Sequence, residues 1–182
     1  MPRNSISLAL LCLLALFVAA PSVKAASAYE IDVGVDETLD RFFYNIRGAQ
    51  ELARKSVGIL VFPSVVKAGF GLGGEYGEGA LRIRGRTVDY YNTLSASVGF
   101  QLGVQERSVI IMFMTPEALD QFRRTAGWKI GADASVAIIT LGVGGSIDSN
   151  KITSPVIGFI LDPKGLMYNL TLEGSKISRI DR

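Results

Sequence analysis

The sequence predicts an α+β protein with a strongly curved, mostly antiparallel, glycine-rich β-sheet or barrel-like sheet and two main helices. Three observations predict this class. Alternating apolar residues fill most of the chain, helical periodicity is confined to two segments, and glycine recurs at nearly every second position of one long segment. No linker or low-complexity tract divides the 182 residues, so we expect one domain over residues 36–182, after a short lead-in at 26–35.

The first 25 residues have the three parts of a secretory signal. Arg3 supplies the positive start, residues 7–20 form the apolar stretch, and Val23-Lys24-Ala25 carries the small residues of a cleavage site. The apolar stretch is shorter than the roughly 20 residues that span a bilayer. We therefore expect cleavage before Ala26 and export to the periplasm or cell envelope.

Loss of this leader changes the charge and the available chemistry. Without Arg3 and Lys24 the 19 basic residues become 17, equal to the 17 acidic residues, so the net charge typical of nucleic-acid-binding proteins is absent. The only cysteine, Cys12, is also removed, and the sequence has no histidine. Disulfides, histidine or thiolate metal sites and histidine-based catalytic triads are thereby excluded. We expect no nucleic-acid partner, no cofactor and no enzyme activity.

The first predicted helix runs from Asp36, a candidate N-cap, to about Ser56. Apolar residues such as Leu39, Phe42 and Ile46 recur on one face at helical spacing. The other face mixes acids with bases and would be either a lipid-facing surface or a solvated one. Its bases are Arg41, Arg47, Arg54 and Lys55.

The second predicted helix begins after Thr115, a candidate cap that Pro116 follows at the first helical position, and Gly127 marks its end. Strands are expected across most of the remaining chain. The uniformly apolar residues 109–114 predict a central strand covered on both faces, and residues 162–165 (Asp-Pro-Lys-Gly) predict a turn between two strands.

The segment 69–79, "GFGLGGEYGEG", contains a G-x-G-x-x-G pattern at Gly69, Gly71 and Gly74. A dinucleotide site needs a helix directly after these glycines, whereas alternating residues follow here, so the pattern does not predict nucleotide binding. Its glycines instead occupy nearly every odd position. Such a bare strand face is typical of close approach by another backbone, or of bulges that curve a sheet.

Glu75 is the exception on this bare face. A carboxylate there would be either solvent-exposed at a groove or paired with a base such as Arg or Lys, because an unpaired buried charge costs too much free energy. Farther along the chain, Arg82, Arg84 and Arg86 alternate with Leu81, Ile83 and Gly85. On one strand they would project to the same side. They could hold anionic lipid headgroups, aided by Tyr90 and Tyr91, or form a solvated sheet face.

Successive blocks of the sequence resemble the SYLF domain. The blocks lie between Leu39 and Ile180 and read "SVGILVFPSVVKAGFGLGGEYGEGAL", "YYNTLSASVGFQLGVQ", "SVIIMFMTPEAL", "GWKIGADASVAIITLGVGG" and "KGLMYNLTLEGSKISRI". The resemblance implies a non-enzymatic lipid-binding module, related to eukaryotic members that bind phosphoinositides through basic N-terminal elements and to fungal members that also bind actin. With the leader, it implies a bacterial exported member.

The resemblance also implies which residues contact lipid. The basic N-terminal element corresponds here to residues 36–55, so Arg47, Arg54, Lys55 and the nearby Lys67 are the expected contacts. The partner would be a phospholipid or a membrane surface. Actin is not expected, because an exported protein does not meet it, and the sequence names no protein partner. Two alternatives remain open: a small outer-membrane β-barrel, and a structural or protein-partner module of the envelope.

Overall fold

The computed structural model describes residues 25–141, 145–148, 153–165, 172 and 174–182. The leader at 1–24 lies outside the described residues. Within them, three helices accompany six strands that form one sheet, in the order β3-β6-β2-β5-β4 with β1 paired to β2. All strand pairs are antiparallel except the parallel pair of β4 with β5. The predicted α+β class with a curled, mostly antiparallel sheet is confirmed.

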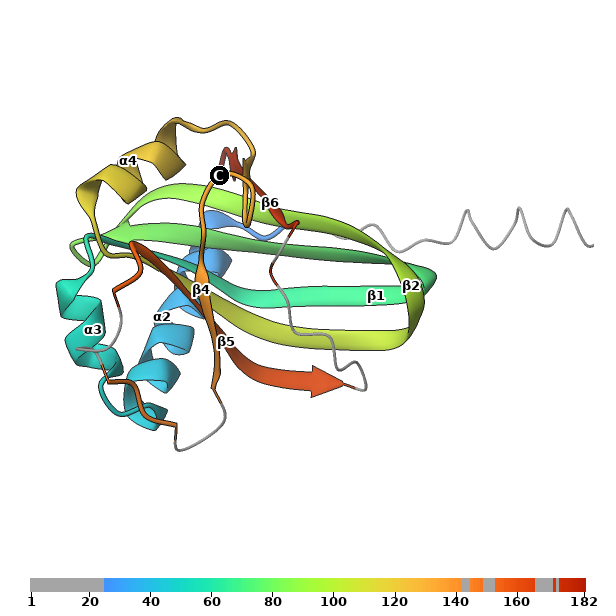
Figure 1. Ribbon diagram of the computed structural model, residues 1–182, viewed down its shortest axis with the longest axis horizontal. Helices are drawn as coiled ribbons and strands as arrows, with labels where there is room; N and C mark the ends of the chain where they lie inside the picture. Colours follow the sequence, from blue (N-terminus) through green and yellow to red (C-terminus); the bar gives the residue numbers. More distant parts are fainter. Residues whose placement is uncertain (1–24, 142–144, 149–152, 166–171, 173) are drawn as a thin grey trace, which may run out of the picture.

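Two very long strands, β1 (Gly58–Ile83) and β2 (Arg86–Phe113), form the frame of the sheet. They pair along their whole length, with register shifts that include one between Phe70 and Leu72. Figure 1 shows the paired strands curling at the end far from the helices. As a result, the second half of β1 lies against its first half.

Glycine allows this close approach. A side chain at Gly77 would lie 2.7 Å from the backbone oxygen of Ser64, and one at Gly79 would overlap the backbone oxygen of Val61. The expectation that the bare glycine face meets another backbone is thus confirmed at these two positions, and the backbone is the strand's own.

Four shorter strands complete the sheet. β5 (Val156–Gly165) and β6 (Lys176–Ile180) pair with different parts of β2, whereas β3 (Trp128–Lys129) extends the β6 edge and β4 (Ala137–Leu141) the β5 edge. Because β5 continues through residues 162–165, the predicted turn there is wrong. The prediction of a central strand is confirmed, since residues 109–113 are buried between β1 and β5.

The first predicted helix is in fact two helices. α2 (Ala28–Asn45) begins eight residues before Asp36, because the Ser27 side chain accepts a hydrogen bond from the Glu30 N–H and Glu30 caps the Ser27 N–H in return. The expected lead-in at 26–35 is therefore mostly helical. The chain then turns at Gly48, whose φ of 83° interrupts the helix, and α3 (Ala49–Lys55) follows.

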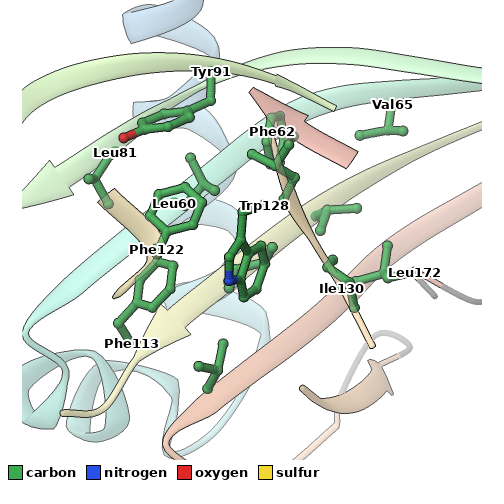
Figure 2. Close-up of a cluster of buried hydrophobic side chains, with 14 of the residues drawn as sticks. Leu60, Phe62, Val65, Leu81, Tyr91, Phe113, Phe122, Trp128, Ile130 and Leu172 are labelled. Atoms are coloured by element: carbon green, nitrogen blue, oxygen red, sulfur yellow. The ribbon is translucent and has the colours of Figure 1, made fainter. Parts of the chain in front are cut away.

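Two clusters of apolar side chains lie on the two faces of the sheet. One lies between the sheet, β3 and α4 (Pro116–Arg124), and Figure 2 shows its side chains gathered around Trp128, whose ring meets Phe122 edge-on at 5.3 Å. The other joins α2 and α3 to the opposite face through Phe42, whose ring lies 5.1 Å from Phe159. Helix α4 starts at its predicted cap, Thr115. Of the helices described, none has the length and apolar character of a membrane span.

Candidate functional site

A groove of about 1030 Å³ lies between α2, α3 and the turn that joins β1 to β2. We call it the hairpin groove. Its apolar lining comes mainly from Leu39 and Phe43 of α2 and from Ile59 and Ile83 of β1. Its charged lining consists of Arg54, Arg82, Arg84, Asp36 and Asp40. Three of the predicted lipid-binding residues therefore meet at one groove.

The turn places these arginines differently from the predicted ladder. Arg84 and Gly85 both have positive φ, 51° and 76°, and form the two-residue connection between β1 and β2. Arg86 consequently starts the next strand, opposite Ile83. The prediction that the three guanidinium groups project from one side of one strand is wrong, because the chain reverses in the middle of the pattern.

Arg82 is the best-anchored base of the groove. Its Nη2 lies 2.7 Å from Asp36 Oδ1 and 3.5 Å from Asp32 Oδ1, and both acids belong to α2. Asp32 also accepts hydrogen bonds from the hydroxyls of Thr87, at 2.6 Å, and Tyr90, at 2.9 Å. Burial and the neighbouring Asp32 carboxylate raise the pKa of Tyr90. These contacts fix α2 across the hairpin, so Arg82 positions the groove.

Arg54 and Arg84 are the exposed bases of the groove. Within the described part of the chain, neither side chain makes an ion pair or hydrogen bond with protein. Lys55, one residue along α3, instead lies 2.9 Å from Glu51. The groove thus presents two guanidinium groups beside an apolar lining, an arrangement that suits an anionic amphiphile.

The other predicted contacts lie elsewhere. Arg47 is exposed in the connection between α2 and α3, where its N–H donates to the Gly145 carbonyl. Arg86 is exposed but does not line the groove. Lys67 is buried on β1. The structure therefore brings together Arg54, Arg82 and Arg84 and leaves Arg47, Lys55, Lys67 and Arg86 outside the hairpin groove.

Glu75 is buried and paired, not exposed. Its Oε2 lies 2.7 Å from Arg107 Nη2, with side chains that are only 3% and 1% exposed. Burial raises the pKa of Glu75, while the positive charges of Arg107 and Lys67 oppose the rise. Among the described residues no donor reaches the second carboxylate oxygen, Oε1. This cluster lies inside the curled sheet and has the role of a structural ion pair.

A second groove follows the line where the two halves of β1 meet, beside the start of α2, and we call it the seam groove. Its volume is about 880 Å³. The charged residues that line it are all acidic: Glu30, Glu75 and Glu78. An anion is therefore better matched by the hairpin groove. The described residues contain no group of three or more acidic side chains that could hold a metal ion.

The sequence did not predict every residue that lines the hairpin groove. Asp36 was predicted only as a helix cap and Leu39 only as part of an apolar helix face, whereas both line the hairpin groove. Phe43 of the same helix lines it too, and both apolar side chains also pack against the core cluster beneath α2. The capping signature at Ser27 and Glu30 was a usable signal for the true start of α2, which would have placed Asp32 and Asp36 within a helix.

Comparison with known proteins gives one family. Residues 94–181 match the family described as Ysc84: Las17-binding protein actin regulator, which is the SYLF domain. The match covers part of β2 and continues through α4 to β6, so it includes Arg107 but stops short of the hairpin groove. No curated protein matches the chain.

Proposed function

We propose that this protein, whose residues 94–181 match the SYLF family, is an exported module that binds anionic phospholipids at the hairpin groove. The SYLF family comprises non-catalytic lipid- and actin-binding modules. The observation that carries the proposal is the placement of two exposed guanidinium groups, Arg54 and Arg84, around an apolar groove. A phosphate head and an acyl chain need these two surfaces side by side.

The contacts of each lining residue indicate its role in lipid binding. A guanidinium group grips two oxygens of a phosphate and remains charged at any physiological pH. Leu39 and Phe43 would cover part of an acyl chain, and each buried methylene contributes about 0.8 kcal/mol. Arg82 contacts both Asp36 and Asp32 of α2 and so lies between this helix and the hairpin, away from a bound headgroup. Asp40, which also lines the groove, would repel an anion and limit the affinity.

Export sets where this binding would occur. The leader predicts delivery to the periplasm or envelope, where phospholipid surfaces are available and actin is not. The proposed partner is therefore the membrane surface, not the actin machinery to which the family description refers. Arg54 and Arg84 are exposed at the hairpin groove, so the headgroup of a lipid still embedded in a membrane could reach them.

Vesicle flotation tests the proposal. Vesicles of phosphatidylcholine alone are compared with vesicles containing phosphatidylglycerol, at low salt, where screening is weak. The processed protein should float with the anionic vesicles only. Arg54→Gln with Arg84→Gln should lower the affinity roughly 30-fold, since each base near an anionic surface contributes about 1 kcal/mol.

The matched control replaces two exposed bases outside the groove, Arg124 on α4 and Lys129 on β3. Arg124→Gln with Lys129→Gln removes the same charge and should leave flotation nearly unchanged. Equal losses of vesicle affinity in both double variants would mean that only net charge matters, and would refute binding at the hairpin groove. Failure of the unaltered protein to float with either vesicle at low salt would refute lipid binding itself.

A further inference from the structure

The start of α2 is hydrogen-bonded to a partly buried acid of β1, Glu78. The backbone N–H of Ala26 donates to Glu78 Oε2 at 3.1 Å. The other carboxylate oxygen, Oε1, accepts from Arg182 Nη2 and from the Tyr76 hydroxyl, each at 2.5 Å. The Glu78 side chain is only 8% exposed. One carboxylate thus links residue 26, the second half of β1 and residue 182.

Ala26, which provides this N–H donor, is also the residue at which the processed chain is predicted to begin. We propose that hydrolysis of the Ala25–Ala26 bond creates an α-ammonium group that forms an ion pair with Glu78 and locks the N-terminus of the processed chain. This modification site is independent of the lipid-binding proposal. Before hydrolysis, residue 26 offers one neutral amide N–H. Afterwards it offers three donors and a positive charge at the same place.

The chemical step needs only water and a peptidase that accepts small residues, such as those at 23 and 25. Water supplies the hydroxyl that remains on the Ala25 carboxyl group and a proton to the Ala26 nitrogen. The carboxyl proton then passes to the new amine, which leaves a carboxylate on the released leader and an ammonium group on Ala26. No redox partner or cofactor is required.

The position of α2 sets the order of events. Ser27 is the N-cap and the helix begins at Ala28, so the residues after the bond become helical as soon as α2 docks. A peptidase binds extended chain, which favours hydrolysis before docking. Folding then brings the new ammonium group to Glu78, and the processed chain gains an ion pair that the precursor lacks.

The sequence makes this ion pair measurable. An α-ammonium group ordinarily loses its proton at about pH 8. The chain has no histidine, and its single cysteine lies in the leader, so neither residue titrates near this pH in the processed protein. The groups facing Ala26 are Glu78 and Tyr76 of β1, Glu30 of α2 and Arg182. Burial and Glu78 raise the pKa of Tyr76, which moves that titration to still higher pH.

The sign of the effect follows from linkage. A positive group that gains a carboxylate partner on folding stabilises the folded state while it is charged. That contribution is present below about pH 8 and is lost as the pH rises through the value at which the folded protein releases the proton. The melting temperature should therefore fall by about 2–4 °C across this range.

The experiment begins with the full chain exported by a bacterial host. Intact-mass analysis should show a protein that begins at Ala26. Its melting temperature is then followed from about pH 6.5 to about pH 9.5. Three samples are compared with it: Glu78→Gln, the control Glu37→Gln, which alters an exposed acid of α2, and unaltered protein acetylated at its N-terminus.

Each outcome either supports or overturns the ion pair between the Ala26 ammonium group and Glu78. The fall in melting temperature should be present in the unaltered protein and in Glu37→Gln, and absent from Glu78→Gln. Acetylation keeps the N–H donor but removes the charge, so it should abolish the fall even if Glu78→Gln fails to fold. A mature chain that begins elsewhere, or a fall that persists after acetylation, would overturn the proposal. In the latter case a group other than the α-ammonium would cause the fall.

Discussion

Two arginine–carboxylate pairs of equal length lie on opposite faces of the β1–β2 hairpin. Arg107 and Glu75 are 2.7 Å apart inside the curled sheet, and Arg82 and Asp36 are 2.7 Å apart beneath α2. Their surroundings differ greatly. The inner side chains are 1% and 3% exposed, whereas Arg82 is 14% and Asp36 is 66% exposed.

Distance alone therefore does not set the energy of an ion pair. Water around Asp36 already solvates its charge, so the outer pair gains little by forming. The inner pair has lost its water, and each partner depends on the other for compensation. We therefore expect the inner pair to contribute strongly to the free energy of unfolding. The outer pair should contribute little and hold α2 only weakly.

The largest expected effect tests the inner pair. Arg107→Met keeps much of the side-chain volume but leaves the Glu75 carboxylate without its nearest positive charge. We expect a loss of about 3–5 kcal/mol in the free energy of unfolding at neutral pH. Denaturant unfolding followed by circular dichroism measures this loss.

The pH dependence identifies Glu75 as the cause. Its pKa is already raised by burial, and loss of Arg107 should raise it further. A group with a raised folded pKa gives stability below its unfolded value, about 4.5, and loses that stability as the pH rises through the folded value. The deficit of Arg107→Met should thus be smallest below pH 4.5 and grow toward neutral pH. Adding Glu75→Gln should restore part of it; a deficit independent of pH would point to packing instead.

Local signals predicted the parts of the fold that depend on neighbours in sequence. Thr115 and Pro116 fixed the start of α4 because capping involves only the next few residues. The alternation of glycines indicated a close backbone contact because strand parity is also local. The curling of the paired strands and the partner of Glu75 could not be predicted this way, since Arg107 lies 32 residues away and meets Glu75 only through the register of the curled strands.

The sequence predicted that arginines would form the candidate site, but it did not predict which of them lie together. Arg54, Arg82 and Arg84 meet at one groove because Arg84 occupies a turn and α3 packs beside it. Lys67 was assigned to the same surface by its nearness in sequence to Arg54 and Lys55. Strand parity places it on the inner face instead, with Glu75. Sequence distance therefore misled where the chain changes from helix to strand.

An intermediate loss of stability is expected from adding a side chain on the inner face, where there is less room for it than on the outer face. Gly79→Ala would press a methyl group against the Val61 backbone on the inner face, whereas Gly74→Ala meets nothing within 4 Å. Overpacking of this kind costs about 1–3 kcal/mol. Thermal unfolding of both variants should show a clear loss for Gly79→Ala alone. Equal losses would mean that glycine serves backbone flexibility at both positions, and the close approach would explain neither.

The smallest effect is expected from the outer pair, and it completes the comparison. Arg82→Gln also removes contacts with Asp32, so a single variant overstates the pair. A double-mutant cycle with Asp36→Asn isolates the coupling between the two side chains. Because Asp36 is mostly exposed, we expect a coupling of about 1 kcal/mol or less, weakened further by salt. Denaturant unfolding of the four proteins measures it. A coupling as large as the loss in Arg107→Met would show that burial does not explain the difference between the two pairs. The Arg82–Asp36 pair would then stabilise the packing of α2 as strongly as the Arg107–Glu75 pair stabilises the interior of the sheet.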